Sequence, residues 1–484
     1  MMLTRRRLLG GISAAGALAL TASVPGARAA TSLPAAPPVV AGKVHEITLV
    51  AAESDMRFGV VDGTKAPLWV YNGEPFHTLR IKLGDTLRVR LENRLAEHTA
   101  VHWHGIRLPN SMDGVQFLTQ PPVEPGQEFT YTFTPPDTGT FFFHSHCDTP
   151  QQLGRGLVGV LIVEGDEPQP FHGEHVLVLK DWRLAEDGTW LPFYTPEGAG
   201  RAGTFGTVRT VNGVEALTGT VPANGDIRLR VLNVDPTRMI QLGVEGADAF
   251  VIATDGNAVE PFPLHTWRMG AAMRVDLHVR APTAGGTFKL LDYFSAEPWP
   301  LAVFTAEAST IPSRPVEARA LYAPHAPLAE IAGAHEISFQ FTASGGAPAA
   351  AVSALSDEDP LSKALLDSLC TGQRGLWAIN KQQWPSGGHR DMPPPLETLE
   401  AGRTYVAELM NATPHPHPIH LHGHMFEVLS ASRQELPRFM ADTVMVMPKE
   451  RVRIAFVAAE GDWMFHCHIL EHQENGMMGW LRIA

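Results

Sequence analysis

From residue 40 onward, apolar residues recur in short runs in which every second side chain is hydrophobic. The runs Thr86–Leu91 and Phe129–Phe133 show this alternation and are rich in β-branched and aromatic residues. A period of two residues is typical of a strand with one buried face. Gly, Pro, Asn and Asp separate the runs, as expected for turns. Helical periodicity is scarce, although a short helix is expected over Leu361–Leu369. The pattern predicts an all-β fold built from β-sandwiches.

A set of short motifs occurs three times along the chain. Each copy contains a run that begins at a glycine and ends at an asparagine, namely Gly84–Asn93, Gly225–Asn233 and Gly402–Asn411. Such internal repetition indicates repeated structural units. Three domains also suit 484 residues, since a domain usually has about 100–200 residues. We therefore expect a removable segment over residues 1–29 and domains over 40–166, 167–312 and 325–484.

Pairs of histidines separated by one residue occupy matching places in the first and third copies. Counted from the asparagine that ends the repeated run, the ninth and eleventh residues are histidines in these two copies, whereas the second copy has Leu242 and Val244 there. A further pair begins five residues after a glycine in each of the two copies. The four pairs are His102/His104, His144/His146, His420/His422 and His466/His468. Histidines scattered through a core would not follow this register, so we interpret all eight as functional.

The spacing of these pairs suits metal binding. Alternate side chains of a strand point to the same face, so two imidazoles separated by one residue face one site. Eight such ligands are enough for more than one metal ion. Imidazole binds copper, zinc, iron and nickel, so the eight histidines alone do not identify the metal.

A second set of ligands in the third copy is more specific. His417, Cys467, His472 and Met477 provide two imidazoles, one thiolate and one thioether. Two His and one Cys with a weak axial Met are typical of a blue copper electron-transfer site. Three of the four ligands lie within eleven residues, so a single loop could supply them. The alternative for Met477 is core packing, because Met478 is adjacent and methionine often fills gaps in a core.

These motifs together resemble those of the three-domain multicopper oxidases, in particular the laccase-like enzymes of bacteria. The resemblance covers nearly the whole chain after the N-terminal segment. It implies three cupredoxin-like Greek-key β-sandwich domains in an all-β fold. The matching motifs are His102-Trp103-His104-Gly105, His144-Ser145-His146, His417-Pro418-Ile419-His420-Leu421-His422-Gly423 and His466-Cys467-His468 through His472 to Met477.

The resemblance also implies four copper ions. His417, Cys467, His472 and Met477 would hold a type 1 copper, and His102 and His420 a type 2 copper. The type 3 pair would be held by His104, His144, His146, His422, His466 and His468. The implied activity is oxidation of a reducing substrate in one-electron steps and reduction of O₂ to water at the trinuclear cluster.

Two acidic or reactive side chains are expected to take part in catalysis. Cys467 would carry electrons, because its neighbours His466 and His468 point from the strand toward the cluster. Asp113 lies where the family has an acid that supplies protons to reduced oxygen. Its alternative role is that of a turn residue before Gly114. Many bacterial relatives have a second acid where this chain has Gln473. Nearby candidates to replace it are Glu471 and Glu474.

The sequence leaves the substrate less well defined. The third copy shows no methionine-rich insertion, and the 16 methionines are spread along the chain. This favours phenols and aromatic amines, as for a laccase. The alternatives are a cuprous-ion oxidase for copper tolerance and a metal-free scaffold protein in the periplasm. The complete set of ligands argues against the scaffold, and the third copy argues against a two-domain nitrite reductase.

Composition and the N-terminus limit the partners and the location. The chain has 38 Lys and Arg against 51 Asp and Glu, which argues against nucleic acid as a partner. The N-terminus has paired arginines at Arg5 and Arg6, an apolar run to about Val24, and small residues around Arg28. This is typical of a twin-arginine signal peptide, and a membrane anchor is the alternative. We expect a periplasmic or secreted monomer with no membrane anchor in the mature chain.

The remaining cysteines and two further histidines have less defined roles. Cys147 and Cys370 could form a disulfide between the first and third domains, but sequence does not give their distance. His415 and His424 flank the third-copy motif. We interpret both as supporting or surface groups rather than as ligands.

Overall fold

The structure is a computed structural model that describes residues 33–54, 67–327, 329–343, 375–385 and 392–484. The expected signal peptide, the expected helix over 361–369 and Cys370 lie outside the described residues. Among the residues that are described, no helix has the length and apolar character needed to cross a membrane.

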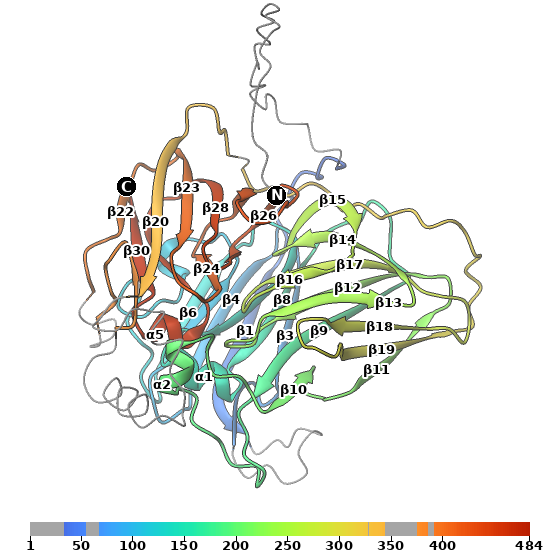
Figure 1. Ribbon diagram of the computed structural model, residues 1–484, viewed down its shortest axis with the longest axis horizontal. Coiled ribbons are helices and arrows are strands. Elements are labelled where there is room, and N and C mark those ends of the chain that lie inside the picture. The colour runs from blue at the N-terminus through green and yellow to red at the C-terminus, as the bar shows by residue number, and fades with distance from the viewer. Residues whose placement is uncertain (1–32, 55–66, 328, 344–374, 386–391) are drawn as a thin grey trace, which may run out of the picture. The chain divides into compact units, whose positions relative to one another are not determined.

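The strands of the described residues form six sheets, two in each copy of the repeat (Figure 1). In the first copy the strand orders are β2-β1-β4-β6 and β3-β8-β7-β5. Its strands are β1 Val44–Ser54, β2 Leu68–Tyr71, β3 Thr78–Lys82, β4 Thr86–Asn93, β5 Val101–His104, β6 Glu128–Phe133, β7 Gly139–Ser145 and β8 Val158–Glu164.

The second copy has sheets of strand order β10-β9-β12-β17-β14-β15 and β11-β19-β18-β13-β16. Its strands are β9 Gly173–Trp182, β10 Val208–Val211, β11 Leu217–Pro222, β12 Asp226–Asn233, β13 Ile240–Glu245, β14 Asp248–Thr254, β15 Asn257–Pro263, β16 Trp267–Met269, β17 Arg274–Arg280, β18 Thr287–Asp292 and β19 Trp299–Glu307.

The third copy has sheets of strand order β21-β20-β23-β28-β25-β26 and β22-β30-β29-β24-β27. Its strands are β20 His335–Ala343, β21 Trp377–Ile379, β22 Glu397–Leu399, β23 Thr404–Asn411, β24 His417–Leu421, β25 Phe426–Ala431, β26 Phe439–Ala441, β27 Thr443–Val446, β28 Arg451–Val457, β29 Gly461–Cys467 and β30 Met478–Ile483. Short helical segments are η1 Asn110–Met112, α1 Thr149–Arg155, α2 Pro196–Gly200 and α5 Leu470–Glu474.

The three copies share one pairing pattern. The first strand of each copy pairs in parallel with the strand that ends in asparagine: β1 with β4, β9 with β12, and β20 with β23. The remaining pairs around them are mostly antiparallel, as in a β-sandwich. This confirms the expected all-β fold of β-sandwiches. The exact domain boundaries stay a prediction from the sequence.

Burial differs between the outer strands and those that carry histidines. Along β4 exposed and buried residues alternate, as the sequence pattern predicts for one buried face. In contrast, β5, β7 and β24 are buried along their whole length. Both faces of these three strands are covered by other parts of the protein. Side chains on them are therefore shielded from water, which is the environment in which imidazoles stay neutral.

Candidate metal centre

Three ligand atoms converge at one fully buried point in the third copy. The Nδ1 atoms of His417 and His472 lie 3.6 and 3.7 Å from the Cys467 sulfur and 3.1 Å from each other. His417 is on β24, Cys467 ends β29 and His472 is on α5. All three side chains are fully buried. Two nitrogens and one sulfur thus face a space of the size that one metal ion needs.

The far nitrogens of both imidazoles are held by hydrogen bonds. His472 Nε2 donates to the carbonyl of Arg201 at 2.7 Å, and His417 Nε2 lies 2.7 Å from the Thr413 hydroxyl. That hydroxyl already donates to Asn411, so it accepts from His417. Both Nε2 atoms therefore carry the hydrogen. Each Nδ1 therefore keeps a free lone pair, which a metal ligand requires. Both Nδ1 atoms lie on the side of the Cys467 sulfur.

Met477 lies beside this group. Its backbone N–H donates to the carbonyl of His472, and its carbonyl accepts from the N–H of Cys467, both at 3.0 Å. The side chain is fully buried. These contacts put Met477 next to two of the three ligands, where sequence predicts the axial ligand. The sulfur–metal bond itself stays a prediction.

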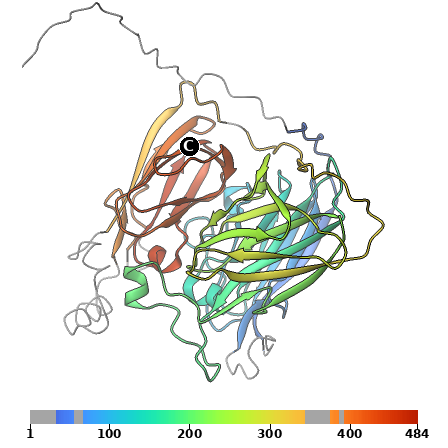
Figure 2. The same ribbon diagram turned by 45° about the vertical axis from the view of Figure 1, so that its right-hand side comes forward.

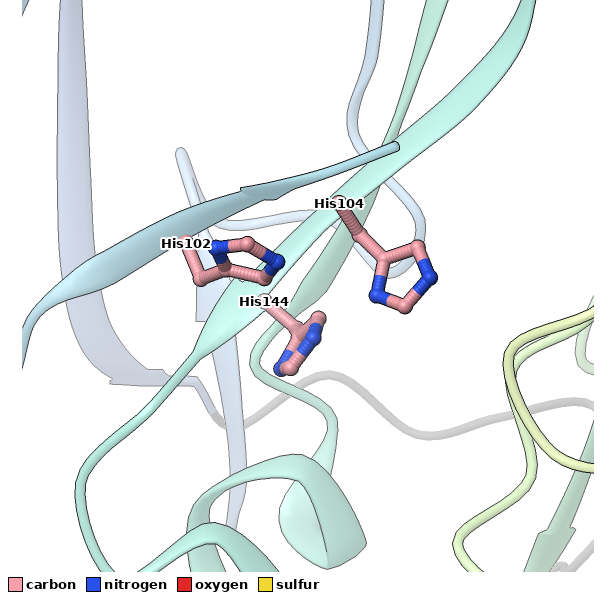
Figure 3. Close-up of side chains that lie close together, drawn as sticks. All are labelled: His102, His104 and His144. Atoms are coloured by element: carbon pink, nitrogen blue, oxygen red, sulfur yellow. The ribbon is translucent and has the colours of Figure 1, made fainter. Parts of the chain in front are cut away.

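The eight paired histidines form a second buried cluster between the first and third copies. On β5 and β7, His102 pairs directly with His144, and on β24 and β29 His420 pairs with His466. Figure 3 shows His102 and His104 on one strand and His144 on the next, with the three rings close together. Rings of the two copies stack on each other, with centroids 3.8 Å apart for His104 and His420.

Several subsets of this cluster could hold a metal ion. Within each, one nitrogen or oxygen per residue lies within 4.8 Å of the others. The histidine subsets are His102/His104/His144, His102/His420/His422 and His146/His422/His466. His468 belongs to none of them, but its ring centroid lies 5.1 Å from that of His104 and 5.3 Å from that of His144. The structure thus brings all eight sequence-predicted histidines together.

Hydrogen bonds on the outside of the cluster determine which nitrogen of each ring is free. The Nδ1 atoms of His102, His144 and His420 donate to the backbone carbonyls of Asp113, Ser145 and Asp442 at 2.8–2.9 Å. The Nε2 atoms of the same three rings are buried and have no hydrogen-bond partner in the described residues. A buried polar atom without a partner is costly, and a bound metal ion removes that cost. The residues therefore fit a metal cluster.

Burial keeps these ligands in the required protonation states. Loss of solvent lowers the pKa of His104, His422 and His466 well below the usual value, and neighbouring imidazoles lower it further. Burial also lowers the pKa of His472 to about 3. The imidazoles are thus neutral, as metal ligands must be. Burial raises the pKa of the Cys467 thiol, so metal binding at this cysteine has to release a proton.

Comparison with known proteins points to one family. Residues 54–168 and 360–484 each match a family model described as multicopper oxidase. A multi-copper oxidase of Pseudomonas thermotolerans is 36% identical, with a TM-score of 0.81 over 92% of this chain and 100% of that chain. One from Pseudomonas parafulva is 34% identical, with a TM-score of 0.74 over 90% of this chain and 100% of that chain. A multicopper oxidase of Mycobacterium tuberculosis is 29% identical over 98% of this chain and 95% of its own length.

The chain belongs to the multicopper oxidase family. Its fold is accordingly that of cupredoxin-like domains, and its metal is copper. It is an oxidoreductase that acts on O₂.

In this multicopper oxidase a single strand connects the two centres. Cys467 faces His417 and His472, whereas His466 before it faces the cluster, because successive side chains of β29 point to opposite sides. His468 follows directly after β29, and its ring lies beside those of His104 and His144. The Nδ1 atom of His466 also donates to the Cys467 carbonyl at 2.9 Å. A few covalent bonds and one hydrogen bond therefore join the cysteine to the histidine cluster.

Asp113 contacts the cluster directly. Its carboxylate accepts from His422 Nδ1 at 2.9 Å and lies 3.3 Å from His102 Nδ1, and it is 1% exposed. It also follows η1 and precedes Gly114, which has a φ of +84°. The two roles considered from the sequence, turn residue and acid at the cluster, are thus compatible in one residue.

The other acids on α5 have different surroundings. The Glu471 carboxylate accepts from the Thr195 N–H at 2.9 Å and from the Thr204 hydroxyl at 2.6 Å. It therefore anchors the segment around α2, which lies beside α5 in Figures 1 and 2. Glu474 lines a surface cavity of about 640 Å³ together with Asp148, Trp190 and Tyr194. Gln473 is 1% exposed.

The flanking histidines and Cys147 take supporting positions. His424 Nδ1 donates to the His422 carbonyl at 2.7 Å, and its Nε2 accepts from the Ala459 N–H at 2.9 Å. The His415 ring meets Trp377 edge-on at 6.0 Å. Cys147 is buried with a free thiol in the described residues, and Cys370, considered from the sequence as a possible disulfide partner, lies outside them.

Sequence reasoning missed two groups that contact the ligands. The Trp377 ring lies 4.8 Å from His472 and 5.4 Å from His417, and its Nε1–H donates to the Ala199 carbonyl at 2.7 Å. Asp442 accepts from His104 Nε2 at 2.9 Å. The only signal for Asp442 is the polar pair Asp442-Thr443 within the apolar run from Phe439 to Val446.

Proposed function

We propose that this multicopper oxidase is laccase-like and oxidises phenols and aromatic amines with four bound copper ions. His417, Cys467, His472 and Met477 would hold the type 1 copper. His102 and His420 would hold the type 2 copper, and the other six histidines of the cluster the type 3 pair. When bound, these ions supply one-electron transfer at the type 1 site and four-electron reduction of O₂ to water at the cluster.

The substrate assignment rests on the segment that covers His472, residues 195–204. The outward nitrogen of this imidazole donates to the Arg201 carbonyl, and His472 itself is fully buried. A reducing substrate would therefore approach the Arg201 side of the site. A carbonyl oxygen has two lone pairs and can accept a second hydrogen bond, which suits the O–H of a phenol or the N–H of an aromatic amine.

The composition of the covering segment supports the same assignment. Residues 195–204 contain no Met, Cys or His. Cuprous ion prefers soft thioether and thiolate ligands, so this segment offers no such docking group next to His472. Among the relatives, a protein of Cryphonectria parasitica named laccase is 26% identical over 90% of this chain. The second candidate, cuprous-ion oxidation, has support from relatives named copper resistance protein A, which match 52–58% of the chain.

Oxygen uptake by the copper-loaded enzyme distinguishes the two candidates. A phenol and cuprous ion are supplied in parallel assays at equal concentration, with free copper removed before each assay. The proposal expects faster uptake with the phenol. Faster uptake with cuprous ion would contradict the laccase-like assignment and favour a role in copper tolerance.

We also propose that the enzyme is exported by the twin-arginine route to the periplasm or beyond. The support is the Arg5-Arg6 pair followed by an apolar run and small residues. Fractionation of cells that express the double variant Arg5→Lys/Arg6→Lys tests this, because the proposal expects the oxidase to remain in the cytoplasm.

A further inference from the structure

Arg274, which lies in the second copy, contacts residues of all three copies. The second copy itself contains none of the predicted metal ligands. Arg274 begins β17 and is fully buried. Its Nε donates to the Thr140 carbonyl on β7 of the first copy at 3.2 Å, and its Nη1 donates to Ala272 in its own copy at 2.9 Å. Nη1 and Nη2 donate to the two carboxylate oxygens of Asp442 in the third copy at 3.0 and 2.5 Å. This is the two-point geometry of a strong guanidinium–carboxylate pair.

The partner of Arg274 determines the state of a cluster histidine. Asp442 Oδ1 lies 2.9 Å from His104 Nε2. An ionised carboxylate only accepts, so His104 Nε2 carries the hydrogen. His104 Nδ1 is left buried without a hydrogen-bond partner in the described residues, with its lone pair available to a metal. Asp442 thus selects the tautomer in which Nδ1, rather than Nε2, is the ligand atom.

A second contact links the guanidinium to the same imidazole. Arg274 Cζ lies 5.6 Å from the centre of the Phe142 ring. Phe142 in turn stacks on the rings of His104, at 4.4 Å, and His144, at 5.3 Å, and it meets the His468 ring edge-on at 6.4 Å. The guanidinium therefore restrains the orientation of the His104 ring through a stack as well as through Asp442.

The backbone next to His104 leaves room for this ion pair. Gly105 has a φ of +81°, and a Cβ there would lie 2.4 Å from Asp442 Oδ2 and 2.5 Å from Arg274 Nη2. Any side chain at this position would displace the pair. Asp255, also from the second copy, accepts from the N–H groups of Arg274 at 2.8 Å and of Asp442 at 3.2 Å. Both members of the pair are thus fixed at their backbones by one carboxylate.

We propose that Arg274 is a positioning residue for the histidine cluster. Acting through Asp442, it fixes the tautomer and the ring orientation of His104, so the ligand-free second copy determines how tightly the cluster holds copper. The proposal rests on the assignment of the cluster as a copper site. The second copy thus contributes to metal binding although it supplies no metal ligand.

Copper retention by the loaded full-length protein tests the proposal. The variant Arg274→Lys keeps the charge, but a lysine cannot bind both Asp442 oxygens in a fixed fork. Loss of a partner behind a metal ligand typically costs about 10- to 100-fold in metal affinity. We therefore expect a chelator to remove the cluster copper from Arg274→Lys at a chelator concentration about 10- to 100-fold lower than from the wild type. The near-ultraviolet absorption of the type 3 copper pair should be lost with it. The blue band of the type 1 site should persist.

Arg228→Lys is the matched control. Arg228 is 4% exposed and donates through Nε and Nη2 to Asp276 at 2.9 and 2.6 Å. It therefore resembles Arg274 in burial and in pairing with a buried aspartate, although both of its N–H groups donate to the same oxygen, Oδ2. Within the part of the chain that the structure describes, Asp276 has no hydrogen bond to a cluster histidine. Wild-type copper retention in Arg228→Lys with weakened retention in Arg274→Lys supports the proposal. Equal retention in the two variants overturns it.

A double-mutant cycle tests whether Arg274 acts through Asp442. Asp442→Asn should itself weaken copper retention, and Arg274→Gln added to it should produce little further loss, because the two residues act as one unit. The double variant removes both charges of the Arg274–Asp442 pair, whereas each single variant leaves one of them buried without the other. Losses that multiply would overturn the proposal. A wild-type protein that binds no cluster copper would instead contradict the proposed function.

Discussion

At the scale of single residues, Cys467 has the most constrained role in the molecule. Its sulfur lies within 3.7 Å of two imidazole nitrogens, and its two neighbours in sequence belong to the histidine cluster. No other residue of the described chain links the two centres in this way. Electron transfer between them should therefore depend on this side chain.

Replacing Cys467 by serine should remove the blue colour and the oxidation of phenols together. A serine hydroxyl is a hard, protonated ligand that does not provide the thiolate of a blue copper site. The cluster histidines are untouched, so copper bound there should remain. Visible absorption, activity and copper content measured on one preparation check this. Substrate oxidation at the wild-type rate in Cys467→Ser would show that electrons enter by another route.

Asp113 is the second residue with a specific chemical prediction. Asp113→Asn keeps an oxygen that accepts from His422 but removes the acid, so copper content should be unchanged. A positioned general acid contributes about 100-fold or more. Reoxidation of the reduced enzyme by O₂ should then slow by about 100-fold, and the difference should be larger at high pH, where protons are scarce.

Stopped-flow mixing of reduced Asp113→Asn with O₂ measures this step separately from reduction by substrate. Reduction by a phenol should be nearly unchanged, because it takes place at the type 1 site. Should the variant reoxidise as fast as the wild type at every pH, Asp113 would be only a turn residue and a hydrogen-bond partner of His422.

At the scale of strands and helices, the sequence predicts the metal ligands well but not the residues that contact and orient them. The eight cluster histidines follow from the register of the repeats, because strand alternation puts both members of a pair on one face. Asp442, Arg274 and Trp377 could not be predicted in this way. Asp442 and Arg274 act on His104, which lies in the first copy, whereas Trp377 contacts His472 from a distant strand of the same copy. Only the tertiary packing brings these residues to the ligands.

Glu471, on the helix that carries His472, is another residue whose contacts could not be predicted from the sequence. Glu471 was considered from the sequence as a proton donor for the cluster, but its carboxylate accepts hydrogen bonds from Thr195 and Thr204 of the covering segment. These donors belong to the second copy, and no periodicity links them to α5. The contacts favour a structural role, in which Glu471 fixes the segment whose Arg201 carbonyl binds His472.

Glu471→Gln should therefore weaken the attachment of the covering segment to α5. Hydrogen bonds to a charged group contribute about 1.5–3 kcal/mol each to the free energy of unfolding. The neutral amide of glutamine still accepts hydrogen bonds, so only part of this energy should be lost. We expect the free energy of unfolding of the copper-loaded enzyme to fall by about 1–3 kcal/mol in denaturant titrations. Thr204→Ser keeps the hydroxyl donor and is the control, which should lose less. No loss of stability in Glu471→Gln would contradict this role.

At the scale of the whole molecule, the buried imidazoles link stability to pH. Burial lowers the pKa values of His104, His144 and His468 in the folded chain below the unfolded value of about 6.5. Below that pH the unfolded chain binds more protons than the folded chain. Stability of the copper-free protein should therefore be fully present above about pH 6.5 and should decrease as the pH falls below it.

Thermal unfolding of the copper-free protein between pH 8 and pH 5 checks this dependence. The double variant His104→Asn/His144→Asn has two fewer groups of this kind, so its unfolding temperature should decrease less steeply toward low pH. Identical slopes for the variant and the wild type would show that other groups dominate the acid sensitivity.

The most direct test of the account as a whole is an anaerobic reductive titration of the copper-loaded wild type, followed by mixing with O₂. The account holds that one type 1 site and one three-copper cluster act together. It predicts that each chain takes up four electrons, that the blue band bleaches, and that O₂ restores the band with water as the product. Uptake of a single electron, or accumulation of hydrogen peroxide in proportion to the O₂ consumed, would contradict it.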